Sequence, residues 1–343
     1  MIATRLTRMF ALQYPIVLAP MGGVSGGRLA AAVSKAGALG LVGGGYGNAD
    51  WLRRELSYVA NATSYPWGVG FITWSIDGAA IELALKYRPH AVMLSFGDPT
   101  PYASLIRSSG CKLICQVQDL EGARVAQEAG ADLIVAQGSE AGGHGASRAT
   151  LPLVPAVVDA VAPTPVLAAG GIADGRGLAA ALMLGAHGAL IGTRFYASVE
   201  ALGSDLAKQR IVQAHGHDTA RTRVFDIVRK LGWPAANTGR ALRNRFLERW
   251  DGREGELAAS LVNEQTAYSN AAREADFDTA VVWAGEAVDL IKDVERAATL
   301  VARISAEACV QLGLGARMAW AGAGTPPLAA SSNVQQTALG TLK

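Results

Sequence analysis

Aromatic residues, cysteines and long apolar runs are all scarce in this sequence, and each shortage excludes a class of protein. Phe, Trp and Tyr make up 6% of the 343 residues, whereas half of all residues are apolar. A large core must therefore consist mainly of aliphatic and small side chains. Three cysteines are too few for the disulfide framework of a small secreted domain.

Two of the cysteines lie in or beside an apolar, strand-like run. Cys111 and Cys115 stand four residues apart, which in a strand places them on one face, about 13 Å apart. That separation is too long for a disulfide bond. We interpret both as buried thiols in a reducing cytoplasm.

Neither a nucleic acid nor a membrane is expected as a partner. The formal net charge is +2, and no basic stripe interleaved with aromatic residues occurs. The locally basic runs 221–223 and 240–249 are interpreted as solvated helix faces. No stretch of about 18 uninterrupted apolar residues is present. Residues 13–15 (QYP) interrupt the apolar N-terminal segment, so we expect no signal peptide and a cytoplasmic protein.

Eight short apolar runs follow one another along the chain, and successive runs start 20 to 33 residues apart. Continuous apolar runs are typical of parallel strands that are buried on both faces. Helical patterns separate them, so we predict a (β/α)₈ TIM barrel rather than an open doubly wound sheet. The predicted strands are 15–21, 39–43, 67–73, 91–95, 112–117, 132–136, 165–169 and 188–192.

Three of the helix-to-strand junctions share a Gly-Ala pattern. Gly37, Gly130 and Gly185 end apolar helical stripes, as glycines do at helix C-termini. Asp174 is expected to cap the helix that follows it. This repetition supports a repeated β/α unit.

After Tyr196 the sequence changes character, and residues 201–310 contain no strand-like apolar run of similar strength. We predict a barrel over 1–213 and a helical, substrate-covering cap over 214–285. A helix within 286–316, spanning 288–312, should pack back on the barrel. The tail 317–343, rich in Gly, Pro and Ser, is expected to be loosely ordered.

In a TIM barrel, function lies in the loops that follow the strands. The loops 19–25 and 43–47 expose bare glycine backbone, which alone is a weak signal. The loops 170–174 and 192–195, after the seventh and eighth strands, carry Gly-Gly and Gly-Thr. Backbone amides at these two loops form the usual phosphate site of the fold.

The loop after the sixth strand, 137–145, contains the strongest candidate for catalysis. His144 follows two glycines at the predicted barrel mouth. An imidazole there can take a proton from a carbon acid or stabilise an anion. His90 and His187 belong to the opposite end of the barrel. His215 and His217 lack a further ligand pattern, so we expect no metal site.

Several catalytic motifs are absent. The sequence has no Walker loop and no HExxH helix. The glycine run 22–27 is not followed by the acidic residue of a Rossmann fingerprint. No cysteine lies in the loop after the sixth strand, so chemistry of the inosine monophosphate dehydrogenase type is not expected.

Four ordered motifs together resemble the nitronate monooxygenases, formerly called 2-nitropropane dioxygenases. They are APMGG at 19–23, QGSEAGGHG at 137–145, AAGGIADGRG at 168–177 and GALIGTRF at 188–195. The resemblance covers roughly residues 10–200, with a weaker echo at 284–294. It implies FMN at the barrel mouth and FMN-dependent oxidation of alkyl nitronates, or nitroalkanes, by O₂ to carbonyl compounds and nitrite.

The resemblance also implies residue roles. His144 would be the catalytic histidine, which removes the α-proton of a nitroalkane or holds a nitronate. The flavin ring would lie near Met21, Gly22 and Gly70, and the phosphate near Gly171, Gly192 and Thr193. Gln116 and Gln137 would bond to the polar edge of the ring. The full set of expected cofactor-binding residues is Ala19, Pro20, Met21, Gly22, Gly70, Gln116, Gln137, Gly142, Gly143, Gly170, Gly171, Gly192 and Thr193.

One departure from the family pattern leaves alternatives open. Gly70 stands where the family often has asparagine, which puts one polar contact to the flavin in doubt. NAD(P)H-dependent quinone reductases and a flavin-dependent enoyl-acyl-carrier-protein reductase share the barrel and a Gly-His pair. A non-flavin barrel for a phosphorylated substrate and a flavoprotein used for storage are further alternatives. A small molecule and O₂ are the expected partners, and a homodimer is left open.

Overall fold

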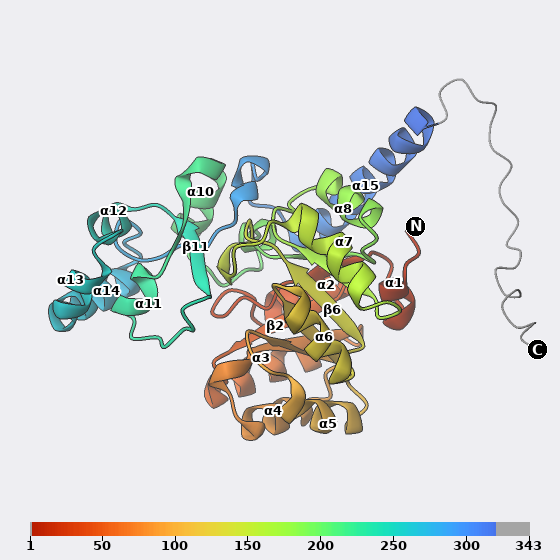
Figure 1. Cartoon of the computed structure of the whole chain (residues 1–343), viewed down its shortest axis with the longest axis horizontal. Coiled ribbons are helices and arrows are strands. Elements are labelled where there is room, and N and C mark those ends of the chain that lie inside the picture. Colours follow the sequence, from red (N-terminus) through yellow and green to blue (C-terminus); the bar gives the residue numbers. More distant parts are fainter. Residues whose placement is uncertain (1, 320–343) are drawn as a thin grey trace, which may run out of the picture.

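Eight parallel strands form one sheet that curls into a barrel in the computed structural model, which describes residues 2–319 (Figure 1). Their order in the sheet is β1-β9-β8-β6-β5-β4-β3-β2. A parallel bridge between Val17 and Leu39 joins the two ends of the sheet. The predicted (β/α)₈ barrel is confirmed. The strands are β1 (Ile16–Leu18), β2 (Gly40–Gly45), β3 (Trp67–Ile72), β4 (Ala91–Ser95), β5 (Lys112–Val117), β6 (Leu133–Gln137), β8 (Val166–Ala169) and β9 (Ala189–Ile191).

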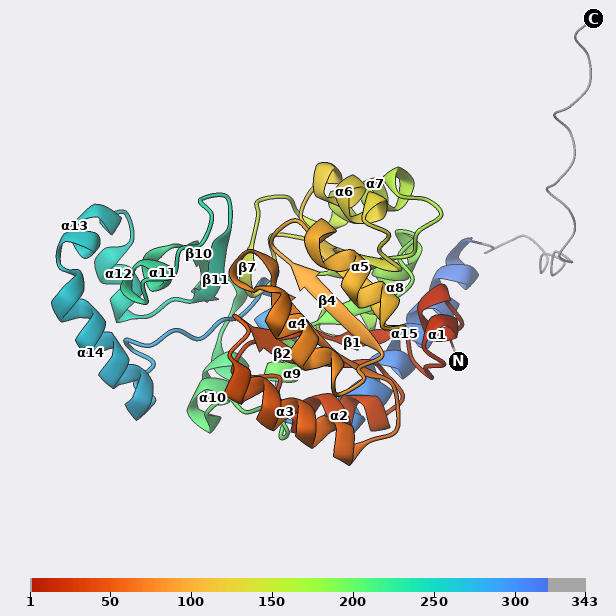
Figure 2. The ribbon, with the colours of Figure 1, turned by 90° about the horizontal axis from the view of Figure 1, so that it is seen from below.

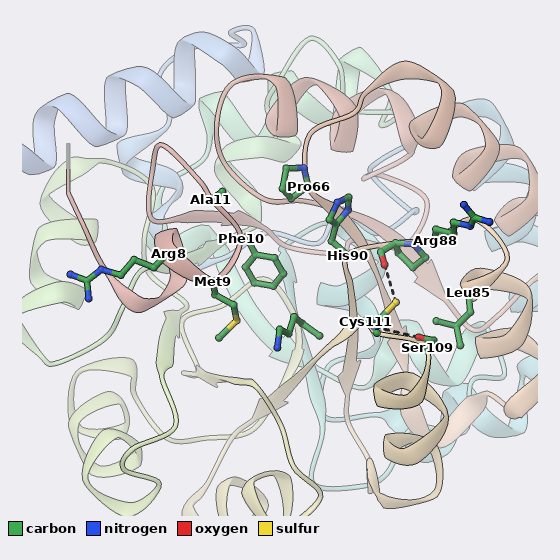
Figure 3. Close-up of a pocket in the computed structure, with 13 residues that line it drawn as sticks. Arg8, Met9, Phe10, Ala11, Pro66, Leu85, Arg88, His90, Ser109 and Cys111 are labelled. Atoms are coloured by element: carbon green, nitrogen blue, oxygen red, sulfur yellow. Dashed lines mark hydrogen bonds between the residues drawn. The ribbon is translucent and has the colours of Figure 1, made fainter.

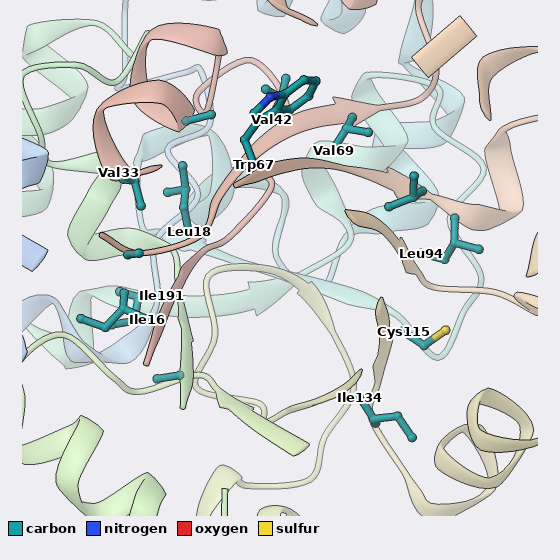
Figure 4. Close-up of a cluster of buried hydrophobic side chains, with 14 of the residues drawn as sticks. Ile16, Leu18, Val33, Val42, Trp67, Val69, Leu94, Cys115, Ile134 and Ile191 are labelled. Atoms are coloured by element: carbon teal, nitrogen blue, oxygen red, sulfur yellow. The ribbon is translucent and has the colours of Figure 1, made fainter. Parts of the chain in front are cut away.

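Each strand is buried on both faces, as the continuous apolar runs predicted. Alternate residues point into the barrel, where Val17, Met93 and Leu167 belong to one buried cluster. The residues between them point outward into a second cluster beneath the helices, which Figure 4 shows around Leu18 and Val69. A parallel sheet needs this covering on both sides.

A helix follows most strands and packs on the outside of the barrel (Figures 1 and 2). Gly37, Gly130 and Gly185 adopt φ values of +90°, +83° and +91° just after their helices, so glycine is favoured there. Asp174 caps its helix by accepting from two backbone amides, as predicted. The outer helices are α2 (Gly27–Lys35), α3 (Ala49–Ala62), α4 (Gly78–Leu85), α5 (Thr100–Ser108), α6 (Leu120–Glu128), α7 (Thr150–Ala160) and α8 (Gly175–Met183).

The amino end of the barrel is closed by the N-terminal segment. Helix α1 (Arg5–Met9) and the turn after it place Leu6 and Phe10 in the interior cluster. A cavity of about 540 Å³ lies beside them. It contains His90 at the amino end of β4, as expected, and Cys111, whose Sγ lies 2.8 Å from the Pro89 carbonyl (Figure 3).

The buried thiols lie on the outer face of the sheet. Cys111 and Cys115 both belong to the cluster between sheet and helices, and neither forms a disulfide. Burial raises the pKa of Cys115 to about 12, so its thiol stays protonated. Their interpretation as buried, unpaired cysteines is confirmed.

A smaller unit follows β9 and projects beyond one end of the barrel (Figure 2). It has its own core, in which Phe225, Leu247 and Trp250 are buried. The helices and short 3-10 turns between β9 and the last helix are α9 (Thr193–Tyr196), α10 (Asp205–Gln213), η2 (Gly216–Asp218), α11 (Val224–Val228), α12 (Arg245–Trp250), α13 (Glu254–Ala259), α14 (Leu261–Glu274) and η3 (Glu286–Leu290).

The sequence suggested a cap built from helices alone, but the cap also contains two strands. Strands β10 (Thr219–Thr222) and β11 (Thr238–Leu242) pair antiparallel. Strand β11 also pairs with β7 (Gly143–Gly145), which belongs to the loop after β6. Both cap strands are short and largely polar, so they give no apolar run. That the cap covers the substrate stays a proposal.

The last helix begins later than predicted. The sequence indicated a helix over 288–312, but α15 spans Ala297–Ala319. The buried Arg194 guanidinium donates to the Asp293 carbonyl and pairs with its carboxylate at 3.0 Å. This contact needs extended backbone before Ala297, whose N–H then donates to Glu200 at 2.9 Å.

Helix α15 packs beside α8 and then leads away from the barrel (Figure 1). By length and composition alone, the helix over residues 297–318 could cross a membrane, and a third of its most apolar 18-residue window is buried. Leu300, Val301 and Ile304 lie in the outer barrel cluster, which accounts for their apolar character. The predicted loose tail began at 317; residues 317–319 continue the helix, and 320–343 lie outside the described residues.

The N-terminal segment that closes the amino end of the barrel leads to a prediction about stability. Leu6 is fully buried inside the barrel, whereas Leu151 on α7 is 67% exposed. We expect Leu6→Ala to lower the free energy of unfolding by about 2–5 kcal/mol, because it removes buried methyl groups and leaves a cavity. Leu151→Ala should change it by less than about 0.5 kcal/mol. Urea denaturation of both variants measures this. Equal losses of unfolding free energy in the two variants would contradict a stabilising role for the N-terminal segment.

Candidate active site

A cavity of about 810 Å³ opens at the carboxyl ends of the strands, between the barrel loops and the cap. His144 and all thirteen expected cofactor-binding residues line it. The structure thus brings together segments that lie as far apart as Ala19 and Thr193. Trp233 and Trp283 of the cap also line it.

Two glycines leave exposed backbone on the wall of this cavity. A Cβ added at Gly22 would have its nearest neighbour 3.9 Å away, at the Gly45 Cα. A Cβ added at Gly192 would meet only ordinary contacts, the closest at 3.5 Å to Ala19. The protein therefore has room for a side chain at both positions. A ligand that approaches the backbone would account for glycine there.

Other glycines of the set are needed by the protein's own packing. A Cβ at Gly142 would lie 2.6 Å from the backbone nitrogen of Gly285. A Cβ at Gly70, which faces the barrel interior, would overlap with the ring of Pro20. This contact gives a physical reason for the departure at position 70, because no larger side chain fits beside that ring.

The loops after β8 and β9 form the side of the cavity that the sequence assigned to a phosphate. Gly170 and Gly171 both have positive φ, +101° and +72°. Gly192 precedes α9, and the Thr193 hydroxyl accepts a hydrogen bond from the Gly285 amide at 3.0 Å. That hydroxyl keeps its own proton for a ligand.

Two glutamines lie at the mouth of the barrel and point inward. Gln116 follows Ile114 by two residues, and Gln137 follows Val135 in the same way, so both share the interior face. The Gln116 side-chain amide donates to Gln137 at 3.2 Å. Gln137 in turn donates to the His144 carbonyl at 3.0 Å, which joins the barrel wall to β7.

His144 is held by contacts from three directions. Its Nε2 lies 3.0 and 2.9 Å from the two carboxylate oxygens of Asp226. Its ring stacks on Trp233, with 3.5 Å between centroids and 2° between planes. The ring of Trp283 lies at 5.1 Å and is tilted. The imidazole is therefore fixed in position, with its side chain 8% exposed.

Aromatic residues surround the stacked pair. Trp233 contacts Trp74 and Phe96 edge-on, and its indole N–H donates to the Tyr46 hydroxyl at 2.9 Å. Burial raises the pKa of Tyr46, so its phenol stays neutral at pH 7. Aromatic rings thus form much of the cavity wall near His144.

Two arginines of the cap brace the loop that carries His144. Arg221 donates to the carbonyl of Ser139 at 3.1 Å and also to that of Gly145. Arg240 donates to the same Ser139 carbonyl at 2.9 Å. Burial lowers the pKa of Arg221 to about 10, with a smaller effect from Arg240, so it remains charged at pH 7. The interpretation of these two arginines as solvated helix residues was wrong, because they lie on strands that dock on the barrel.

Sequence reasoning missed the residues that hold His144. Neither Asp226 nor Trp233 belongs to a sequence motif that indicates a functional site. Both become neighbours of His144 through the pairing of β11 with β7, in which Gly239 lies opposite His144. Eighty-two residues separate His144 from Asp226 along the chain.

The residues present fit the FMN that the sequence motifs imply. The exposed backbone at Gly22 and Gly192 leaves space for a flat ring and a phosphate to approach. The amides near Gly171 and the Thr193 hydroxyl are donors of the kind that bind phosphate. No group of three or more His, Cys, Asp or Glu side chains within residues 2–319 is arranged to hold a metal ion.

Known proteins share both the sequence and the fold. Residues 3–75 and 71–307 match the family described as Nitronate monooxygenase. A protein from Staphylococcus aureus strain Newman, described as "Probable nitronate monooxygenase", is 31% identical over 332 residues, which cover 82% of this chain and 91% of the relative.

Two solved structures extend the likeness. FabK from Thermotoga maritima has a TM-score of 0.82 and 33% identity, and the match covers 92% of this chain and 98% of the other. Nitroalkane oxidase from Streptomyces ansochromogenes has a TM-score of 0.77 and 28% identity, over 90% of this chain and 99% of the other. The chain therefore belongs to the nitronate monooxygenase family and is a flavin-dependent oxidoreductase.

Proposed function

We propose that this enzyme binds FMN and oxidises alkyl nitronates, and nitroalkanes, with O₂ to carbonyl compounds and nitrite. The observation that carries the proposal is the placement of His144. It lies on the wall of the glycine-lined cavity and is hydrogen-bonded to a buried carboxylate. The family membership and the likeness to a nitroalkane oxidase support the same substrate class.

The thirteen cavity residues would hold the cofactor. Met21, Gly22 and Gly70 would lie along the ring, and Gln116 and Gln137 near its polar edge. Gly171, Gly192 and Thr193 would bind the phosphate, with the remaining residues beside them. The remaining residues are Ala19, Pro20, Gly142, Gly143 and Gly170. FMN, when bound, supplies the transfer of electrons from substrate to O₂.

The protein's own residues would handle the proton and the substrate's shape. His144 would remove the α-proton of a neutral nitroalkane, and it would hold the negative charge of a nitronate. Trp233 and Phe96 would exclude water near the reacting carbon, since both lie on the same side of the cavity. The expected partners remain a small nitro compound and O₂, in the cytoplasm, with a homodimer left open.

A second candidate is an NAD(P)H-dependent flavin reductase of the quinone or enoyl-acyl-carrier-protein type on the same barrel. Arg229 lines the cavity, and among residues 2–319 its side chain makes no recorded hydrogen bond or ion pair. Guanidinium groups bind phosphates well, so this residue favours a nucleotide as the second substrate. The FMN site would be the same in both cases.

Anaerobic reduction separates the two candidates. We expect an alkyl nitronate to bleach the visible absorption of the purified flavoprotein, while NADH and NADPH leave it unchanged over the same time. Rapid bleaching by a nicotinamide nucleotide, and none by the nitronate, would replace the monooxygenase with the reductase. Isolation of a colourless protein that takes up no FMN would exclude both.

The role of His144 predicts a large loss of turnover. His144→Ala should lower kcat/KM for a neutral nitroalkane by about 10²–10⁴-fold, the range for removing a general base. His90→Ala is the matched control, since His90 lies at the opposite end of the barrel. Oxygen-consumption assays on flavin-loaded variants measure this. Equal rates for wild type and His144→Ala would refute a catalytic role.

The phosphate site predicts a loss of cofactor affinity. Gly192→Ala should raise the Kd for FMN at least about tenfold, or about 1.4 kcal/mol, because its methyl group would enter the ligand's space. Gly78→Ala is the control, since Gly78 has no atom within 4 Å of an added Cβ and lies outside the cavity. Titration of the apoprotein, followed by flavin fluorescence, gives both values. Unchanged affinity in Gly192→Ala would place the phosphate elsewhere.

A further inference from the structure

Asp226 is a buried carboxylate with one partner. It lies on α11 of the cap, and its side chain is 4% exposed. Within residues 2–319, the only recorded hydrogen bonds of this carboxylate are those with Nε2 of His144. A buried charge is costly unless it is paired and hydrogen-bonded. The fold therefore brings Asp226 into the interior only where it meets this imidazole.

The contact decides which ring nitrogen carries the proton. A carboxylate can only accept hydrogen bonds, so the short distances to both Asp226 oxygens place a hydrogen on Nε2. In the neutral ring, Nδ1 then has the free lone pair. The parallel stack on Trp233 prevents the ring from tilting out of this orientation.

The other ionisable groups around His144 and Asp226 do not compete for the contact between these two side chains. Tyr46 approaches from the β2 side and Tyr268 from α14, and burial raises the pKa of both, so both stay neutral at pH 7. Arg229 lies one turn after Asp226 on the chain, and no ion pair between the two is recorded. The negative charge nearest to His144 is thus that of Asp226.

We propose that Asp226 is a positioning residue that makes Nδ1 of His144 the base of the reaction. This rests on the proposed function, in which a nitroalkane loses its α-proton. The proton passes from the α-carbon to Nδ1, and the electron pair of the broken C–H bond remains on the substrate as the nitronate. His144 becomes an imidazolium, whose charge the Asp226 carboxylate balances.

Comparing a neutral nitroalkane with its nitronate distinguishes a positioning role of Asp226 from a purely structural one. Asp226→Asn keeps the size of the side chain but removes the charge and allows the wrong tautomer. We expect kcat/KM for a neutral nitroalkane to fall about 10²-fold, and for the corresponding nitronate less than about 5-fold, because the nitronate needs no deprotonation. Asp278→Asn is the matched control. Asp278 is another cap aspartate, 45% exposed and paired with Arg210.

A readout that needs no turnover tests the proposal independently. Nitrogen-15 NMR of labelled His144, assigned with His144→Ala, should show the Nε2–H tautomer in wild type and a changed population in Asp226→Asn. The Asp278→Asn spectrum should match wild type. An Nδ1–H tautomer in wild type would overturn the proposal, and so would identical spectra for wild type and Asp226→Asn.

The remaining outcomes are also decisive. Equal losses with nitroalkane and nitronate, in a variant that retains flavin, would reduce Asp226 to a structural role. If Asp226→Asn does not fold, the tautomer of His144 in the wild-type protein alone decides whether the proposal holds. If wild type oxidises neither substrate, the proposed function fails, whereas an Nε2–H tautomer would still support the Asp226–His144 contact.

Discussion

The antiparallel pairing between β7 and β11 is the contact on which the active site depends. Strand β7 lies in a loop of the barrel, and β11 belongs to the cap, so their backbone bonds join the two units at the histidine itself. Arg221 and Arg240 add bonds from the cap to the carbonyls of Ser139, before that strand, and of Gly145, its last residue. Without this pairing, neither Asp226 nor Trp233 would have a fixed relation to His144. The loop that carries His144 is thus positioned by the cap as well as by the barrel strand that precedes it.

Glycine serves two different purposes at the barrel mouth. At Gly142 the backbones of two segments approach so closely that a methyl group would collide with Gly285. At Gly22 and Gly192 the protein itself leaves room, and the surface is bare backbone facing the cavity. The first kind is required by packing and the second fits a ligand. A motif that contains both kinds looks uniform in sequence, although only the second kind leaves room for a ligand at the glycine itself.

The charged side chains at the junction between barrel and cap form hydrogen bonds with specific partners. Arg221 is largely bonded to carbonyl oxygens rather than to a carboxylate, and burial lowers its pKa without neutralising it. Asp226 meets an imidazole instead of an arginine, although Arg229 lies close in sequence. Such contacts contribute little net stability once desolvation is counted. Their hydrogen bonds do, however, hold the side chain of His144 and the loop that carries it in specific positions.

The sequence was sufficient to predict the barrel, because each strand is a local apolar run and each turn glycine, such as Gly37 or Gly185, reflects a local backbone requirement. It also brought the cofactor loops and His144 to one end, since parallel strands all finish on the same side. The cap strands, the late start of α15 and the partners of His144 were decided by tertiary structure. Strands β10 and β11 form through pairing rather than apolar patterning, and the backbone before α15 is extended because the buried Arg194 binds there. Asp226 looks like any surface carboxylate in sequence, and only the docking of α11 over β7 buries it against the imidazole.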